Sequence, residues 1–486
     1  MSQKFKFQMY QHLQSCADQI YVEAQKAADD IGIPADLRGR FGLTGAISGC
    51  PVPLRQEIRA SIEKGTAKII PLAKLVEEIR EIVKSVYGDQ YDACPLNTCE
   101  AGLWASFDAL FTPPLTGRGD NYRARYIVPY EKHLHHHGSY GRPFPGRFKD
   151  LFADRGSTPG EMGYYGKRQN NLDTVIVPLV GGRYEVHGIK YWPVPMLAKV
   201  DPEASIEKIA MIAERQAPFL TGFTSLAYET PGYGYAAKDE EGAPLLQKYL
   251  AELAEEFDLP YIQDNAWGLP FIGSDLRRTG ADVIVYSMDK ATGSATSGLI
   301  IGKEEYMVSV RRALGMHGDR WGTSASYGKA AYVAFDPGKE ALLGQVAALR
   351  TLRDRPEILT KPVDQLYEVV KQEFAKINPV LAKGIVISKT YNSMAVEINY
   401  EGTWTENGLG IPIFSIEDMY GGSHLLQNGL AHMGIIPTIC YDGNIFISPG
   451  FATTDDEGHL LEQRARWAVQ GLVRLLEIIA RYAGLI

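Results

Sequence analysis

Short apolar runs alternate with amphipathic helical stretches through the middle of the chain, from about residue 90 to residue 325. Between two of these runs, residues 243–259 (APLLQKYLAELAEEFDL) have apolar positions at helical spacing. Strands of unbroken apolar character separated by helices predict a mostly parallel sheet that is covered on both faces. The apolar runs are RYIVPY (125–130), TVIVPLV (174–180), FLTGFTSLAYET (219–230), PYIQD (260–264), DVIVYS (282–287) and GLIIG (298–302).

The two ends of the chain have a different pattern from the middle. Residues 1–85 predict an N-terminal helical arm, with a Gly/Pro-rich interruption at 38–58 (RGRFGLTGAISGCPVPLRQEI). Residues 86–325 carry the alternating pattern and predict a large α/β domain. Residues 326–486 begin with a long helical stretch, continue through GIVISKTYNSMAVEINY and NIFISPG, and end in a helix. This last region predicts a smaller α+β domain at the C-terminus.

Composition excludes several classes of protein. The 486 residues are 45% hydrophobic and 22% charged, which is typical of a globular chain. There are 50 Lys and Arg against 58 Asp and Glu, a net charge of −8 without a block of one sign, so we expect neither a nucleic acid nor an anionic membrane as partner. The five cysteines are scattered without CxxC spacing, which favours a reducing, cytoplasmic location without disulfides or a zinc site. We also expect no signal peptide and no membrane span, which needs about 18 consecutive apolar residues.

Opposite charges follow two neighbouring strands of the predicted sheet. Lys290 ends the stretch VIVYSMDK and is followed by small residues, and Asp264 ends PYIQD about one strand–helix–strand unit earlier. In open parallel sheets the ligand site lies beyond the carboxyl ends of the strands. Pyridoxal phosphate suits this pair, because its aldehyde condenses with a lysine amine and its ring nitrogen needs an acidic partner. Taken singly, Lys290 could be a surface lysine and Asp264 a helix cap.

The segments around these two residues resemble a known family. The pattern S-M-D-K-x-x-G-x-x-x-x-G-L-I-I-G is similar to the lysine segment of fold-type I pyridoxal-phosphate enzymes, the aspartate aminotransferase superfamily. An acidic residue just before the lysine, here Asp289, is similar to the lysine segment of selenocysteine synthases of the seryl-tRNA selenium transferase type. The segment D-N-A-W-G (264–268) resembles the family's D-x-A-x-G strand end. The resemblance implies a three-layer αβα large domain around a mostly parallel seven-stranded sheet. It also implies a Schiff base at Lys290, Asp264 on the ring nitrogen and Ala266 beside the cofactor.

The same resemblance implies where the phosphate is held. LNTCEAGLWASFDALF (96–111) resembles the family's G-[ST]-x-E-A turn, in which backbone N–H groups at a helix N-terminus bind the phosphate. Asn97, Thr98 and Cys99 fall in this turn, although Asn97 stands where Gly is usual. The hydroxyl of Ser287 would add a further contact. An ordinary helix start remains the alternative for residues 97–99.

Further segments resemble parts of the family that complete the cofactor site. EKHLHHHGSYGR (131–142) resembles the H-x-[SA] segment, in which an imidazole stacks on the ring. His137 matches best, with His136 and His135 as alternatives; the histidines could instead bind a metal or line a polar loop. HGDRWGTSASYG (317–328) resembles the loop that reaches the phosphate of the other subunit, with Thr323 in the matching place. The protein is therefore expected to form a homodimer or a larger assembly of dimers.

The reaction is less well defined than the cofactor. Many family members have an arginine in the penultimate strand that binds the substrate carboxylate, and NIFISPGFATTDDEG has Phe446 there. Arg320, Arg142 or Arg147 could replace it, or the substrate could lack a free α-carboxylate, as an amino acid esterified to tRNA does.

The acidic net charge and the lack of a basic N-terminal module argue against tRNA. We therefore expect a small amino-acid substrate and β- or γ-elimination or replacement, as in a lyase. Transamination and selenium-transferase-like action on aminoacyl-tRNA are the alternatives. A catalytically silent binding protein would be expected to have lost Lys290 or Asp264, and both are present.

Overall fold

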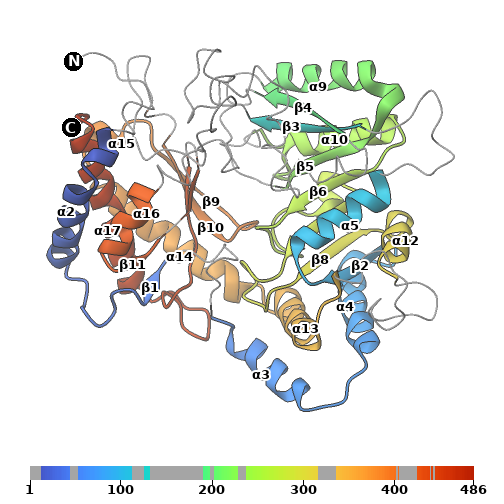
Figure 1. Ribbon diagram of the computed structural model, residues 1–486, viewed down its shortest axis with the longest axis horizontal. Coiled ribbons are helices and arrows are strands. Elements are labelled where there is room, and N and C mark those ends of the chain that lie inside the picture. The colour runs from blue at the N-terminus through green and yellow to red at the C-terminus, as the bar shows by residue number, and fades with distance from the viewer. Residues whose placement is uncertain are drawn as a thin grey trace, which may run out of the picture.

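The protein divides into a large sheet with its helices and a smaller group of helices and strands around the C-terminus (Figure 1). The large sheet is formed by strands from the middle of the chain, between residues 91 and 303. The computed structural model describes residues 12–43, 53–111, 125–131, 190–196, 202–227, 237–315, 335–400, 403, 424–437, 439–441 and 444–486.

The large sheet has seven strands in the order β2-β8-β7-β6-β5-β3-β4. Strand β8 pairs antiparallel with both β2 and β7, and the remaining pairs are parallel. The prediction of a mostly parallel seven-stranded sheet is thus confirmed. Because β2 and β7 both run opposite to β8, the carboxyl ends of β2, β7, β6 and β5 lie at one edge. The strands are β2 (Tyr91–Leu96), β3 (Arg125–Glu131), β4 (Lys190–Met196), β5 (Leu220–Leu226), β6 (Tyr261–Asn265), β7 (Val283–Ser287) and β8 (Gly298–Lys303).

Strand β4 lies at the end of the sheet order, beside β3. The sequence pattern did not predict it, because KYWPVPM contains Pro193 and Pro195. Proline cannot donate to a ladder and is confined to edges, and alternate prolines place both missing N–H groups on one side of a strand. The edge position therefore accounts for this composition. The strand predicted at 174–180 lies outside the described residues.

The helices of the large part bury apolar faces on this sheet. Helix α5 (Cys99–Phe111) contacts β2 and β5 to β8 and packs against α12 (Glu304–Ala313). Helix α9 (Pro202–Gln216) contacts β3 and β4, and α10 (Leu245–Glu256) contacts β5 and β6. Helix α10 has the helical spacing seen in the sequence, since Leu246, Leu250, Leu253 and Ala254 are buried. Among the described residues, no helix has the length and apolar character needed to cross a membrane.

The smaller part is built on a four-stranded sheet in the order β12-β13-β10-β9, in which every pair is antiparallel. Helices α14 and α17 pack against each other, and α14 also covers β9 and β10. The elements are α14 (Glu357–Phe374), α15 (Pro379–Ala382), β9 (Val386–Thr390), β10 (Ala395–Asn399), α16 (His424–His432), β12 (Ile439–Tyr441), β13 (Asn444–Ile447) and α17 (Glu462–Tyr482).

The N-terminal helices contact both parts of the protein. Helix α2 packs on α16 and α17, so the blue and red ends of the chain lie side by side in Figure 1. Strand β1 pairs in parallel with β11, whereas α3 and α4 pack on α13 and α4 covers β2. These elements are α2 (Ala17–Ile31), β1 (Phe41–Gly42), α3 (Gln56–Thr66), α4 (Leu72–Tyr87), α13 (Lys339–Asp354) and β11 (Ile435–Ile436).

One buried amide joins the small sheet to the edge of the large one. Asn392, in the turn between β9 and β10, donates from Nδ2 to the Ala227 carbonyl and to Asn265 Oδ1, both at 2.9 Å. Its Oδ1 accepts from Asn265 Nδ2 and from the Ser274 backbone N–H, both at 3.0 Å. Gly273, at φ +81°, allows the close approach, because a Cβ there would lie 2.3 Å from the Asn392 Cα. Asn392 thus fixes the small sheet next to the carboxyl end of β6.

Replacing Asn392 tests this junction. Asn392→Ala leaves the Ala227 carbonyl, the Ser274 N–H and the Asn265 amide without their buried partner, and we expect it to lower the free energy of unfolding by about 2–4 kcal/mol. Urea denaturation measures the loss. Asn428→Ala, at an exposed amide on α16, is the matched control and should stay near the wild type. Equal stability of the two variants would contradict the role of Asn392.

Candidate functional site

Lys290 is presented by a tight loop that follows β7. The Met288 N–H donates to the Ser297 carbonyl (2.8 Å), and the Ser294 N–H donates back to the Met288 carbonyl (3.1 Å). The Gly293 N–H donates to the Lys290 carbonyl (3.2 Å), and Gly293 has φ +65°, a conformation that favours glycine. The small residues after the lysine therefore close the loop, and they leave Lys290 half-buried in the wall of a cavity.

Asp264 lies on the neighbouring strand, at the same edge of the sheet. Strand β6 pairs in parallel with β7, with Asp264 opposite Val285. The carboxyl group is 1% exposed; its Oδ1 accepts the Ala266 backbone N–H at 3.0 Å, and its Oδ2 is buried without a hydrogen-bond partner. Burial raises the pKa of Asp264 to about 7, although the Ala266 N–H and the charge of Lys290 act to lower it. Oδ2 thus lacks a donor that would stabilise the charged form of the carboxyl group.

The N-terminus of α5 reaches the same edge. The Thr98 hydroxyl accepts the Ala101 N–H at 3.0 Å, as a helix cap does, and the Asn97 N–H donates to the Phe335 carbonyl at 2.9 Å. A Cβ on Gly298 would lie 2.2 Å from the Thr98 carbonyl oxygen, so a glycine is needed for β8 to pass this turn. The partial positive charge at the N-terminus of α5 favours binding of an anion there.

Cys99 and Ser287 lie close to the two charged residues. Burial raises the pKa of the Cys99 thiol well above its usual value, and the charges of Asp264 and Lys290 also act on it. The Ser287 hydroxyl donates to Asp289, whose second carboxylate oxygen is buried without a partner. The hydroxyl that the family resemblance directs to a phosphate is therefore hydrogen-bonded to Asp289 in this structure.

The structure brings together the predicted residues at the ends of β2, β6 and β7. Ala266 is placed there as well, because its N–H binds Asp264. The remaining predicted positions lie outside the described residues: His135, His136 and His137, Thr323, and the alternative arginines Arg142, Arg147 and Arg320.

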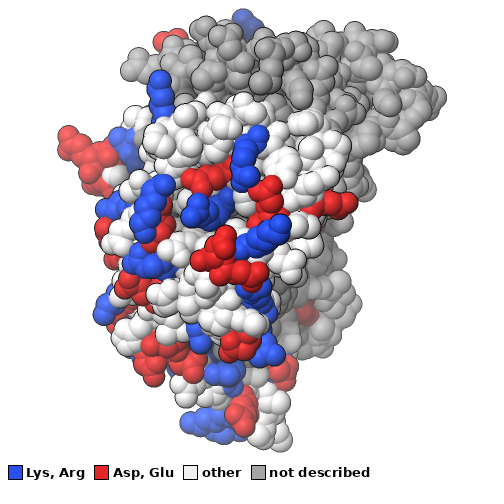
Figure 2. Space-filling view, turned by 90° about the vertical axis from the view of Figure 1, so that its left-hand side faces the viewer, with Lys and Arg blue, Asp and Glu red and all other residues white. Residues whose placement is uncertain are grey.

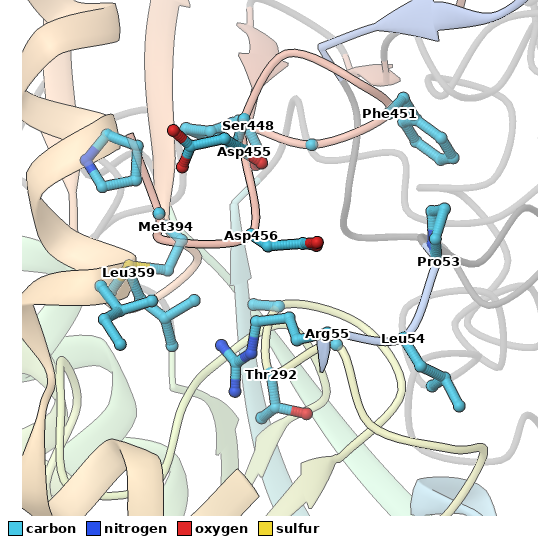
Figure 3. Close-up of a pocket in the computed structure, with 18 of the residues that line it drawn as sticks. Pro53, Leu54, Arg55, Thr292, Leu359, Met394, Ser448, Phe451, Asp455 and Asp456 are labelled. Atoms are coloured by element: carbon cyan, nitrogen blue, oxygen red, sulfur yellow. The ribbon is translucent and has the colours of Figure 1, made fainter. Parts of the chain in front are cut away.

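A cavity of about 270 Å³ opens beside Lys290 (Figure 3). Residues 290–293 form one wall, and the segment before and at the start of α3, helix α14 and the loop after β13 form the others. Leu359, Met394 and Phe451 supply apolar surface, and Arg55 lies beside Thr292. Sequence reasoning missed Arg55, because the Gly/Pro-rich stretch around it predicts only an interruption between helices.

Phe446 has an apolar role in the fold. It lies on β13, is 6% exposed and packs edge-on against Trp267, with ring centroids 5.4 Å apart. Trp267 belongs to the D-N-A-W-G segment that contains Asp264. The position at which an arginine was expected is thus part of the packing between the small sheet and the end of β6.

Comparisons with known proteins identify the fold. No protein-family model matches the sequence, and no curated protein matches it either. Among solved structures, the chain is similar to an aminotransferase from Bacillus anthracis, with a TM-score of 0.52, 14% identity, and coverage of 90% of this chain and 92% of that one. It is also similar to taurine:2-oxoglutarate aminotransferase from Bifidobacterium kashiwanohense, in complex with PLP and glutamate. Here the TM-score is 0.51, the identity is 13%, and the match covers 87% of this chain and 85% of that one.

A complex of SepCysS with the N-terminal domain of SepCysE is also similar, with a TM-score of 0.50, 12% identity, and coverage of 91% of this chain and 96% of that one. Identities at this level show a shared fold. This chain therefore has the three-layer αβα fold of the fold-type I pyridoxal-phosphate proteins, with a smaller α+β part, as the sequence predicted.

The buried carboxyl group of Asp264 should make the free energy of unfolding depend on pH. The pKa of Asp264 is raised to about 7 in the folded protein, whereas an unfolded chain has about 3.9. The folded state then holds an extra proton between these values, so Asp264 lowers the free energy of unfolding as pH rises through this window. In protein without a ligand, we expect Asp264→Asn to gain about 2–3 kcal/mol relative to wild type between about pH 5 and pH 8.

Urea denaturation of both proteins at the two pH values measures this gain. Asp36→Asn, at an exposed aspartate, is the control and should show the same pH profile as wild type. Parallel profiles for Asp264→Asn and wild type would mean that the carboxyl group is not protonated on folding.

Proposed function

We propose that this protein is a pyridoxal-phosphate-dependent enzyme that acts on a small amino acid, with Lys290 as the residue that binds the cofactor covalently. The observation that carries the proposal is the buried, unpartnered Oδ2 of Asp264 at the same sheet edge as Lys290. Burying a charge without a partner is costly, so a site of this kind fits a ligand that brings a protonated nitrogen. The protonated ring of pyridoxal phosphate is such a ligand.

The residues of the site divide the work of holding the cofactor. Asp264 would accept the hydrogen bond of the ring nitrogen, and the turn from Asn97 to Cys99 at the start of α5 would hold the phosphate through the N–H groups of Thr98 and Cys99, because the Asn97 N–H donates to the Phe335 carbonyl. His137 or His136 and the partner's copy of the Thr323 loop remain proposals from the family resemblance. When bound, pyridoxal phosphate withdraws electrons from the substrate Cα and so weakens the bonds to that atom.

Lys290 would move the proton. It lines the cavity, so its amine would take the Cα proton of a bound substrate as a general base. The apolar side chains of Leu359, Met394 and Phe451 line part of this cavity. The cavity of about 270 Å³ suits a small substrate.

We propose β- or γ-elimination or replacement as the reaction, with transamination as the second candidate. The second candidate is supported by the fold, because structures of similar fold include aminotransferases. Action on aminoacyl-tRNA is supported by the Asp289–Lys290 sequence and by Phe446 in place of the expected arginine. On the face over α2 and α17, acidic and basic side chains are interspersed (Figure 2), including the ion pair of Arg481 with Glu23 at 2.9 Å. This face offers no extended basic patch for RNA.

The proposal includes a cytoplasmic homodimer, as the family resemblance of the Thr323 loop implies. Cys16, Cys94 and Cys99 are free thiols, which suits a reducing compartment.

Covalent attachment is the direct test of Lys290. Wild-type protein mixed with pyridoxal phosphate and reduced with borohydride should carry the pyridoxyl group on the peptide that contains Lys290, found by mass spectrometry. Lys290→Ala should lose both this label and the activity, because Lys290 is the only lysine among the described residues that line the cavity. Lys371→Ala, at an exposed lysine on α14, should keep both. A fully active Lys290→Ala protein would end the proposal.

The two reaction types differ in what they need. Elimination releases ammonia and a keto acid from one amino acid, whereas transamination releases a keto acid only when an acceptor keto acid is present. We expect at least one amino acid of a broad panel to give ammonia without an acceptor, measured by a coupled ammonia assay. Products that appear only with an acceptor would establish transamination instead.

A further inference from the structure

Arg55 carries a buried positive charge that the protein leaves partly unpaired. The residue immediately precedes α3, and its side chain is 16% exposed. Glu57 Oε1 lies 2.8 Å from Nε and forms an ion pair, but Nη1 and Nη2 are buried without a hydrogen-bond partner. Burial lowers the pKa of the guanidinium, yet arginine stays protonated in proteins. The outer edge of the guanidinium therefore lacks an acceptor.

Arg55 lines the cavity that Lys290 also lines. Figure 3 shows Arg55 beside Thr292, which belongs to the loop that presents the lysine, with Leu359 on the other side of the Arg55 guanidinium.

The acidic side chains across the cavity are engaged elsewhere. Asp455 Oδ1 accepts the backbone N–H groups of Glu457 (3.0 Å) and His459 (2.7 Å), and its Oδ2 lies 3.0 Å from the His459 ring. Asp456 lies 3.8 Å from Arg59 on the exposed rim. Neither carboxylate is among the partners of Arg55, so its missing acceptor fits a group that enters the cavity from outside.

We propose that Arg55 binds the carboxylate of the amino-acid substrate. Because Glu57 occupies the Nε side, the free Nη1 and Nη2 present the two parallel donors that a carboxylate accepts bidentately. Phe446, at the other candidate position, offers only an apolar ring. The inference rests on the proposed function, and it narrows the substrate to an amino acid with a free carboxylate rather than one esterified to tRNA.

Aminooxyacetate and methoxyamine make a matched pair of probes. Both react through the same aminooxy group with the aldehyde of the bound cofactor and change its absorbance, but only aminooxyacetate carries a carboxylate. The ratio of their second-order rate constants therefore measures carboxylate recognition without knowledge of the substrate. The ratio is measured for wild type, Arg55→Met, Arg55→Lys and Lys64→Met, together with the dissociation constant of pyridoxal phosphate. Lys64→Met removes an exposed charge from the same helix and is the control.

We expect wild type to prefer aminooxyacetate and Arg55→Met to lose about 10- to 100-fold of that preference, the loss typical of a hydrogen bond to a charged group. Arg55→Lys should keep part of the preference, because it retains the charge and loses the planar fork. Lys64→Met should match wild type, and all variants should bind pyridoxal phosphate equally. Should Arg55→Met fail to fold in a thermal melt, the reduced preference of Arg55→Lys decides the case.

Other outcomes overturn the inference in distinguishable ways. An unchanged ratio in Arg55→Met, or no preference in wild type, removes the carboxylate role and leaves the proposed function standing. Weaker pyridoxal phosphate binding by Arg55→Met with an unchanged ratio would assign Arg55 to the cofactor phosphate. Failure of wild type to bind pyridoxal phosphate at all would defeat the proposed function itself.

Discussion

The parallel register between β6 and β7 is the constraint on which the candidate site depends. It sets Asp264 opposite Val285, so the carboxyl group and the loop that carries Lys290 open at the same edge of the sheet. Successive side chains of a strand point to opposite faces, so a slip of one residue would turn Asp264 to the other face. The antiparallel strand β8 supports this edge, because Gly298 lets the N-terminus of α5 approach closely.

The buried charged side chains of this protein differ in whether the fold supplies their hydrogen-bond partners. Asp92 is fully buried, and Arg80 and Arg311 both donate to its carboxylate, so this group is satisfied by the fold alone. Asp264 and Arg55 are also buried, but each keeps polar atoms without partners, and both lie near Lys290. Leaving such groups unpaired lowers stability, and a bound ligand can offset that cost. Arg55 lines the cavity together with Lys290, whereas Asp264 lies at the end of the neighbouring strand. Opposite unpaired groups on either of these elements suit a ligand that carries both signs, as an amino acid on a protonated cofactor does.

The cavity is made by segments that are distant in the sequence. The residues before α3, the loop after β7, helix α14 and the loop after β13 each contribute a wall. Their relative position depends on the junction at Asn392, which holds the small sheet to the ends of β5 and β6. Packing of Trp267 on Phe446 adds an apolar contact at the same junction. Small shifts of one part against the other would therefore change the cavity before they changed either core.

The sequence by itself determined the class of fold, the strands β3, β5, β6, β7 and β8, and the position of Asp264 and Lys290 at the ends of neighbouring strands. Each of these features depends on a short stretch of sequence, since a buried strand needs an unbroken apolar run and a ligand site needs polar residues at strand ends. It did not indicate β4, whose prolines suit only an edge, nor β2, where Asp92 and Pro95 interrupt the apolar pattern. Only the tertiary structure decided that β8 runs antiparallel, because an apolar run reads the same in either direction. It alone brought Arg55 to the lysine, since the unpaired state of a guanidinium depends on neighbours that are hundreds of residues away.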